Sequence, residues 1–371
     1  MTTKTRRVIR FTCGMVGAWT VASLVAGTLI RGRSALFGAL FGALGPTELM
    51  VADSVWDVLA RAVLGGAVAG LIASYLELKV FPRHARRVSA GVMLLLRTLG
   101  YASAAILVIL TAVYFIGTRE MGLGFRDVLS SPGFRGFVEN RVFAQFILSF
   151  VVSSFIINAA LQVWRLLGPG AASQILLGRY LRPVHEDRSF LFIDLADSTG
   201  IAERLGPLKF ADFKNDFFHD VAEPVLDTKG QIVQYVGDEV MITWPRDGRG
   251  SSSAADSVKC FFEVCKHVDA RAAQYHERYG EVPRFRAGLH SGPVVVSQLG
   301  DLKTEIVFSG DAVNTAARIQ GLCKELQKDF LASIDGVGEL GLPDGVTREE
   351  LGLHNLRGRV APVTLLALSR A

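Results

Sequence analysis

The chain has 371 residues, of which 50% are hydrophobic, and its formal net charge is +5. The apolar excess is concentrated in residues 1–166, whereas residues 180–371 have the composition of an ordinary mixed domain. The basic residues form short clusters without interleaved aromatic residues, which argues against a nucleic-acid partner. The cysteines form no CxxC pair, so the sequence predicts neither a disulfide framework nor a zinc site.

Apolar stretches in the N-terminal part approach the roughly 20 residues that a helix needs to cross a bilayer. They cover residues 11–30, 58–76, 90–116 and 142–164. The first follows a basic tail, but it is long for a signal peptide and lacks a clear cleavage site, so an uncleaved span is predicted. Residues 35–51 form a further apolar segment broken by Gly45 and Pro46, for which a re-entrant or interfacial piece is favoured over a span. The sequence thus predicts a membrane domain over residues 1–166, with about four transmembrane helices in contact with a lipid bilayer.

The distribution of basic residues predicts the orientation of these spans. The N-terminal tail and the loop at 79–87 are basic, so both are expected on the cytoplasmic side. An even number of spans then returns residues 188–371 to the cytoplasm, in a multi-pass protein of the plasma membrane. Arg61 and Arg97 lie in apolar stretches, where a charge is often functional. Snorkelling toward an interface, or pairing of Arg61 with Asp57, is the favoured interpretation.

A connector over residues 167–187 links the predicted membrane domain to the remainder of the chain. It begins with Gly168, Pro169 and Gly170, which interrupt the helix, and apolar residues at rough helical spacing follow. The sequence leaves open whether this segment is a passive tether or transmits a movement. It also leaves open whether the membrane domain is only an anchor or senses an unknown ligand.

From residue 188 the pattern alternates between strands and helices. The predicted elements are a strand at 188–194, a long helix to about 227, a hairpin of strands at 231–236 and 239–244, a helix to about 278, strands at 284–290, 293–298 and 304–308, a helix at 311–323 and a closing strand at 362–368. This order suggests an α+β domain of the ferredoxin-like kind over residues 188–371.

Two aspartates stand at the ends of apolar runs in this domain. Asp194 ends the run FLFID, and Asp238 follows the run IVQYVG. Taken alone, Gly237 and Asp238 are typical of a hairpin turn. If the two strands are neighbours, however, both carboxylates converge on one point, as a pair of Mg²⁺ ions on a triphosphate requires.

A second polar set lies in the sequence GDAVNTAAR at 310–318. A helix over this segment places Asn314 and Arg318 on one face, because they are four residues apart. An amide beside a guanidinium suits negative charge that develops on a phosphoryl group. A solvated helix face is the alternative interpretation.

Taken together, these motifs resemble the catalytic domain of the class III nucleotide cyclases, the adenylyl and guanylyl cyclase family. The matching segments, in chain order, are FIDLADST around Asp194, VGDEVM around Asp238, AGLHSGPVV at 287–295 and GDAVNTAAR at 310–318. LRGRVAPVTLLAL at 356–368 resembles the closing hairpin of the family. The resemblance covers about half of the chain. A diguanylate cyclase shares a similar core and turn, but it is not expected to have the AVNTAAR helix.

The resemblance implies that Asp194, Asp238 and the backbone carbonyl of Leu195 bind two Mg²⁺ or Mn²⁺ ions. One ion would lower the pKa of the ribose 3′-hydroxyl, and the other would hold the triphosphate. The turn that contains Ser198 and Thr199 would cradle phosphate oxygens with its amides.

The resemblance also implies that Asn314 orients the ribose and that Arg318 stabilises the charge of the transition state. Either Arg357 or Arg359 stands in for the family's phosphate-binding lysine. Sites in the family are shared: the metals come from one subunit, and the base pocket, Asn and Arg from the other. A homodimer with two equivalent sites is therefore expected.

The base pocket departs from the family pattern. Gln234 and Val307 stand where adenylyl cyclases commonly have Lys and Asp or Thr, and where guanylyl cyclases have Glu and Cys. A glutamine side chain both donates and accepts, so it serves adenine or guanine, and valine offers no side-chain hydrogen bond. Family prevalence favours ATP, which implies a membrane-anchored adenylyl cyclase that releases 3′,5′-cyclic AMP and pyrophosphate. A guanylyl or mixed-specificity cyclase that uses GTP, and a catalytically silent nucleotide-binding receptor module, are the alternatives.

Overall fold

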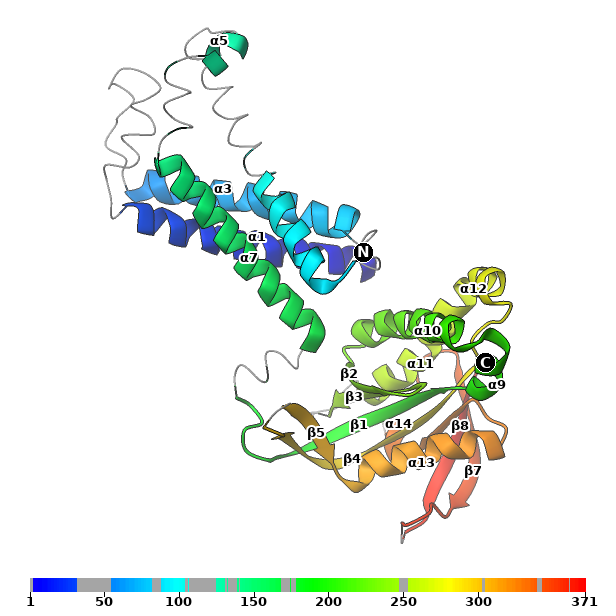
Figure 1. The fold of residues 1–371 in the computed structure, drawn as a ribbon. Helices are drawn as coiled ribbons and strands as arrows, with labels where there is room; N and C mark the ends of the chain where they lie inside the picture. The colour runs from blue at the N-terminus through cyan, green and yellow to red at the C-terminus, as the bar shows by residue number, and fades with distance from the viewer. Residues whose placement is uncertain are drawn as a thin grey trace. The chain divides into compact units, whose positions relative to one another are not determined.

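The computed structural model describes residues 3–31, 55–81, 88–103, 106, 125–130, 132, 139, 141–167, 174, 178–246, 253–301, 304–338, 342–359 and 361–371. The chain divides into two compact units, Met1–Leu166 and Leu167–Ala371. Figure 1 draws both units as ribbons. Each unit is described by itself below.

The first unit is mainly helical in the residues that are described. Its elements are α1 (Thr3–Arg31), α3 (Val55–Tyr75), the π-helical turn η2 (Leu76–Val80), α5 (Phe125–Ser130) and α7 (Arg141–Leu167). Helices α1 and α3 run side by side (Figure 1). Trp19 of α1 is buried and stacks on Phe150 of α7, with ring centroids 4.7 Å apart. Aromatic packing therefore fixes how α7 lies against α1.

Within the described residues, Val63–Val80 is long and apolar enough to cross a membrane, with a mean hydropathy of 1.5. Shorter apolar helices cover Phe11–Leu24, Ala90–Ser103 and Ile147–Val163. These four segments lie within or overlap the four stretches predicted from the sequence. The apolar segment at 35–51 lies outside the described residues.

The expectation that Arg97 snorkels toward an interface is wrong. Its side chain is buried, and its Nε lies 2.8 Å from Oε1 of Glu77, which is also buried. The same carboxylate oxygen accepts a hydrogen bond of 2.9 Å from the hydroxyl of Tyr101. The guanidinium also lies over the ring of Phe81, 5.7 Å from its centroid. A buried counter-charge and an aromatic face hold Arg97 inside the helical unit.

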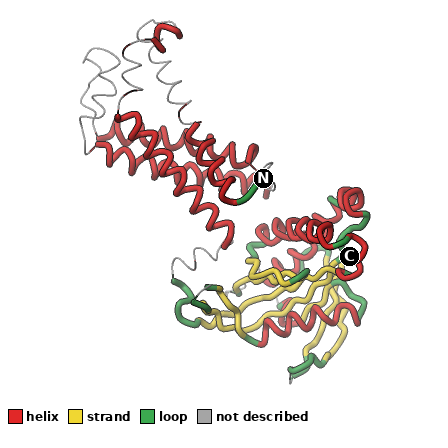
Figure 2. The backbone as a smooth tube through the Cα atoms, viewed as in Figure 1, coloured by secondary structure: helices red, strands yellow, loops and turns green. Residues whose placement is uncertain are grey.

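The second unit is built on an eight-stranded sheet with the order β2-β3-β1-β4-β6-β8-β7, and β5 pairs with β4 off this path. The strands are β1 (Val184–Leu195), β2 (Gln231–Val236), β3 (Glu239–Pro245), β4 (Phe285–Leu299), β5 (Glu305–Ser309), β6 (Phe330–Ser333), β7 (Val346–His354) and β8 (Val363–Arg370). Strand β1 lies between β3 and β4 and is antiparallel to both, whereas β4 and β6 are parallel. Figure 2 shows the strands in yellow between helices in red.

Helices cover both faces of this sheet. They are α9 (Ser198–Leu205), α10 (Pro207–Asp227), α11 (Ser253–Ala270), α12 (Ala272–Tyr279), α13 (Asp311–Glu325) and α14 (Ile334–Val337). Leu191 and Ile193 of β1 pack in one core cluster with residues of α10 and α11, whereas Phe190 and Phe192 pack in another with α13. Successive side chains of a strand point to opposite faces, which explains why β1 is a continuous apolar run. Asp194 is the last residue but one of the strand.

The observed elements differ from the predicted ones in several places. The predicted helix to 227 is divided at Gly206 into α9 and α10, and the helix to 278 is divided at Arg271 into α11 and α12. The strands predicted at 284–290 and 293–298 form the single strand β4, and β6, α14 and β7 were not predicted. Pro293 lies between the segment of β4 that pairs with β6 and the segment that pairs with β5. Its missing N–H is therefore not needed by either strand, so the strand continues through it.

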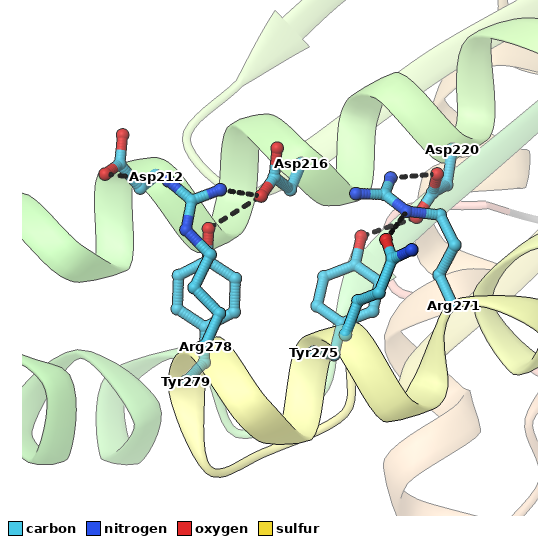
Figure 3. Close-up of polar contacts among 8 residues, drawn as sticks. Asp212, Asp216, Asp220, Arg271, Tyr275, Arg278 and Tyr279 are labelled. Atoms are coloured by element: carbon cyan, nitrogen blue, oxygen red, sulfur yellow. Dashed lines mark hydrogen bonds and ion pairs between the residues drawn. The ribbon is translucent and has the colours of Figure 1, made fainter.

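A polar seam joins α10 to α12 (Figure 3). We use this name for Asp216 and Asp220 of α10 with Arg271, Tyr275, Arg278 and Tyr279. The hydroxyls of Tyr275 and Tyr279 donate to Asp220 at 2.5 Å and to Asp216 at 2.7 Å. Arg271 and Arg278 pair with the same two carboxylates. Burial and these hydrogen bonds raise the pKa of both tyrosines. The seam holds α12 in place although it is separated from α11 at Arg271.

The seam predicts unequal costs for two aspartate substitutions on α10. Asp220→Ala leaves Arg271 and the buried Tyr275 hydroxyl without their acceptor, and we expect it to lower the free energy of unfolding by about 3 kcal/mol. Asp212 is exposed and lies 3.5 Å from Arg278, so Asp212→Ala should cost less than about 1 kcal/mol. Urea denaturation of the full chain, followed by tryptophan fluorescence, measures both. Equal losses in the two variants would contradict the account of the seam.

Candidate active site

Three carboxylates gather where β1 ends. Asp194 is paired across the sheet with Glu239, the first residue of β3, so the preceding hairpin turn brings Asp238 beside it. The side chains of Asp194 and Asp238 lie within hydrogen-bonding reach of one another. Burial and the charge of Asp238 raise the pKa of Asp194 to about 6. Burial, with the charges of Asp194 and Asp238, likewise raises the pKa of Glu239 to about 7. The prediction that the two aspartates converge is confirmed by this geometry.

The negative charge of these three carboxylates is offset only in part by neighbouring groups. Gln320 of α13 donates from Nε2 to Oδ2 of Asp194 at 3.4 Å, and Arg286, which faces Asp194 on β4, lowers the pKa of that carboxyl. Mg²⁺ and Mn²⁺ prefer oxygen ligands that carry negative charge, and the carboxylates at the end of β1 are ligands of this kind.

The aspartate pair needs further oxygens to complete a metal site. Among the described residues, no group of three or more His, Cys, Asp or Glu is placed to hold a metal ion alone. Leu195 ends β1 directly after Asp194, so its carbonyl lies next to the pair along the chain. Asp194 and Asp238 therefore fit divalent cations that take their remaining ligands from backbone and substrate oxygens.

The turn after β1 leads directly into α9. Asp197 adopts a left-handed conformation, with a φ of 58°, and makes no side-chain capping hydrogen bond to the helix. Its carboxylate is instead 3.2 Å from Nη2 of Arg204, which also pairs with Glu281. Ser198 is half-buried and Thr199 is exposed at the first turn of α9. The amides of this turn are thus not capped by Asp197, and a helix N-terminus is a suitable place for phosphate oxygens.

Arg318 lies on α13 beside the loop that precedes β8. Its Nη1 is buried and has no hydrogen-bond partner among the described residues. Gly358 has a φ of 74°, and a Cβ on it would come 3.4 Å from Nη2 of Arg318. A glycine suits this position because it adopts a positive φ without strain and has no Cβ to press on Arg318. An unpaired buried guanidinium nitrogen is costly, so an anionic ligand is the natural partner for it.

The two arginines around Gly358 have different surroundings. Arg359 donates from Nη1 to Oγ1 of Thr315 at 3.2 Å, and its Nε lies 3.3 Å from Oδ2 of Asp311. Arg357 is exposed and forms no hydrogen bond or ion pair with the part of the chain that the structure describes. Arg359 is therefore held to α13, and Arg357 is the arginine available to a ligand.

The remaining residues expected at the site lie on other elements. Asn314 is exposed on α13, one turn before Arg318. Gln234 is exposed on β2, where the register with β3 shifts between Ile232 and Gln234. Val307 is half-buried on β5. Their sequence neighbours pack in the same core cluster as α13.

Sequence reasoning did not single out Gln320, Arg286 or Glu239. Gln320 lies on a different face of α13 from Arg318, and no local motif signals its contact with Asp194. Strand β1 begins at Val184, whereas the strand predicted from the sequence begins at 188. Tyr180 of the predicted connector is fully buried in the second unit, and its hydroxyl donates to Glu186 at 2.9 Å.

Residues 182–358 match the family model of the adenylate and guanylate cyclase catalytic domain. The chain is 42% identical over 209 residues to Adenylate cyclase 2 of Rhizobium meliloti (strain 1021), an alignment that covers 56% of this chain and 57% of the relative. It is 30% identical over 162 residues to Guanylate cyclase 2D of Rattus norvegicus, covering 42% of this chain and 14% of the relative. The alignments thus span little more than half of the first relative and a small part of the second.

A solved bacterial light-regulated adenylyl cyclase has the same fold, with a TM-score of 0.50 at 18% identity, over 59% of this chain and 64% of that one. The likeness to this structure concerns the fold, and the family model shows that residues 182–358 of the second unit are similar to the adenylate and guanylate cyclase catalytic domain. The ferredoxin-like expectation is thereby confirmed in its coarser form, as a mixed sheet covered by helices.

The carboxylate cluster predicts a pH-dependent gain in stability when one charge is removed. Because the pKa of Asp194 is raised in the folded state to about 6, its ionised form opposes folding above that pH, and the penalty disappears as the pH falls toward 4. Asp194→Asn should therefore raise the free energy of unfolding by about 1 kcal/mol at pH 8 and by little at pH 4, allowing for solvent screening. Metal-free denaturation at both pH values measures this. A loss of stability at pH 8 would contradict the charge cluster.

Proposed function

We propose that this chain is a membrane-anchored adenylyl cyclase that converts ATP to 3′,5′-cyclic AMP and pyrophosphate. The observation that carries the proposal is the meeting of Asp194 and Asp238 at the edge of the sheet, with negative charge that neighbouring residues offset only in part. Two Mg²⁺ or Mn²⁺ ions bound there would activate the ribose 3′-hydroxyl and neutralise the leaving pyrophosphate.

The other residues of the site bind and orient the nucleotide. Arg318 offers the buried, unpaired Nη1 to the phosphoryl group whose charge grows during the reaction. Asn314, on the neighbouring turn of α13, orients the ribose, and Arg357 reaches the triphosphate from the loop before β8. The turn at Ser198 and Thr199 cradles phosphate oxygens with its backbone amides.

The two sets of residues act in different subunits of a homodimer. Asp194 and Asp238 of one protomer bind the metals, and Asn314 and Arg318 of its partner complete the site. The placement of Gln320 supports this arrangement, because the face of α13 that meets Asp194 of its own chain is not the face that carries Asn314 and Arg318. Each dimer then holds two equivalent sites, and a monomer is expected to be nearly inactive.

ATP is the proposed substrate because Adenylate cyclase 2 is the more similar of the two relatives described above. Gln234 supplies one amide to the base and Val307 none, so discrimination against GTP is expected to be weak. The family also includes guanylate cyclases, and GTP is the alternative substrate.

The first unit is proposed to anchor the enzyme in the plasma membrane by several spans, with the catalytic domain in the cytoplasm. The segment Val63–Val80 and the three shorter apolar helices support this proposal. Whether the unit also senses a small ligand or lipid is tested by comparing the full chain with and without added lipids in the same turnover assay.

The direct test is a turnover assay that offers the purified full chain ATP and GTP together, with Mg²⁺ or Mn²⁺. Cyclic AMP should be the main product, and Asp194→Ala should lower the rate at least about 100-fold because a metal ligand is lost. Mixing Asp194→Ala chains with Arg318→Ala chains should restore activity, since one site of each mixed dimer is intact. Absence of rescue would contradict the shared site, and nucleotide binding without any turnover would favour a silent receptor module.

The surroundings of the two loop arginines predict different kinetic effects. Arg357→Ala should raise the KM for ATP about tenfold through the loss of a phosphate contact, with the Tm unchanged. Arg359→Ala should mainly lower the Tm, because it removes the contacts with Asp311 and Thr315. Steady-state kinetics and thermal unfolding of both variants check this. A larger KM effect in Arg359→Ala would reverse the assignment.

A further inference from the structure

Gln320 stands out among the residues that the proposed mechanism does not use. Its Nε2 lies 3.4 Å from Oδ2 of Asp194, on the carboxylate that faces Asp238. Within the described residues, it is the side chain that donates a hydrogen bond to this aspartate pair. The contact links residues 126 positions apart in the sequence.

The backbone of α13 is held firmly at this point. A Cβ on Gly288 of β4 would lie 2.3 Å from the backbone N of Gln320 and 2.6 Å from the carbonyl oxygen of Ala316. The helix therefore rests directly on β4, two residues from Arg286, the residue that faces Asp194 across the strands. Because its backbone is fixed by this contact, the Gln320 side chain has a defined reach to Asp194.

The helical geometry gives α13 two functional faces. Asn314 and Arg318 are one turn apart and share a face. Gln320 follows Arg318 by two residues and so lies about 200° around the helix axis from it. One face of α13 therefore meets the aspartate pair of its own chain, and another carries the residues that the proposed dimer gives to the opposite site.

We propose that Gln320 is a positioning residue for Asp194, and that α13 thereby couples the metal-binding pair of one active site to the Asn314–Arg318 set of the other. This inference rests on the proposed function. The Gln320 amide fixes the direction of one carboxylate oxygen and leaves the second oxygen of Asp194 for the metals. Partners that orient a metal ligand in this way typically change metal affinity 10- to 100-fold when they are removed.

Binding of metal and nucleotide at one site then acts on the other through a rigid helix. A shift of Asp194 on metal binding moves Gln320 and hence α13. The same helix presents Arg318, whose Nη1 is buried and unpaired among the described residues. The two sites of a dimer are accordingly expected to depend on one another.

The experiment uses Gln320→Met, which keeps the length of the side chain and removes the donor. Lys324→Met is the matched control, because Lys324 is exposed on the same helix. Mn²⁺ binding to the full chain, with a non-hydrolysable ATP analogue, is followed by electron paramagnetic resonance. The Mn²⁺ affinity should fall about tenfold in Gln320→Met and stay unchanged in Lys324→Met. An equal fall in both variants, or no fall in Gln320→Met, would overturn the proposal.

Mixed dimers separate positioning from a general effect on the helix. When Arg318→Ala and Asp194→Ala chains are combined, the intact site takes its aspartates from the Arg318→Ala chain. Gln320→Met placed in that chain should raise the Mg²⁺ concentration for half-maximal activity about tenfold, with the maximal rate little changed. Placed in the Asp194→Ala chain, it should leave this concentration unchanged.

The outcomes distinguish the two proposals. If the unaltered chain shows no turnover, the proposed function fails, and the Mn²⁺ measurement still decides whether Gln320 orients Asp194. If turnover is present and Gln320→Met has the same effect in either chain of the mixed dimer, the proposed role of Gln320 fails while the enzyme assignment stands.

Discussion

The strands of the second unit bring the carboxylates of Asp194 and Asp238 close enough to repel one another. Strand β1 is buried on both faces, which fixes where Asp194 emerges, and the hairpin of β2 and β3 brings Asp238 to the same edge. Burial then raises the pKa of Asp194, because few groups compensate the charge. The repulsion between the ionised carboxylates costs free energy in the metal-free protein. A divalent cation bound between them would remove this cost, which would favour its binding.

The helix α13 connects this pair to the rest of the site. It packs on β4 at Gly288, receives Arg359 at its first turns and carries Arg318 against Gly358. The closing loop, the helix and the aspartate pair are therefore parts of one packed assembly. A displacement of α13 would change the surroundings of Arg318 and Asp194 together, which is the physical basis of the coupling that we propose.

Much of the site could be predicted because its motifs are local. The turn that contains Asp238 and the spacing of Asn314 and Arg318 define geometry over a few residues, and the hairpin appears where it was expected. The contact of Gln320 with Asp194 could not be predicted in this way, since it depends on how closely a helix approaches a strand distant in sequence. The same holds for Arg97, whose counter-charge lies on another helix.

The strands that sequence reasoning missed or divided each have a cause of their own. Strand β7 is at the edge of the sheet and mostly exposed, so its charged residues hide the apolar alternation of a strand. Strand β6 has four buried residues, too few to show a period. The strands predicted at 284–290 and 293–298 are one strand, β4, which continues through Pro293 because neither β5 nor β6 pairs with it there.

A crystal structure of the dimer with Mn²⁺ and a non-hydrolysable ATP analogue, with the metals located by anomalous scattering, would show directly whether the aspartate pair binds the metals. We expect Mn²⁺ within about 2.2 Å of oxygens of both Asp194 and Asp238. We also expect that Arg318 of the partner subunit contacts the α-phosphate of the same nucleotide. Metal bound away from the aspartate pair, or Arg318 directed into a different cavity, would contradict the account.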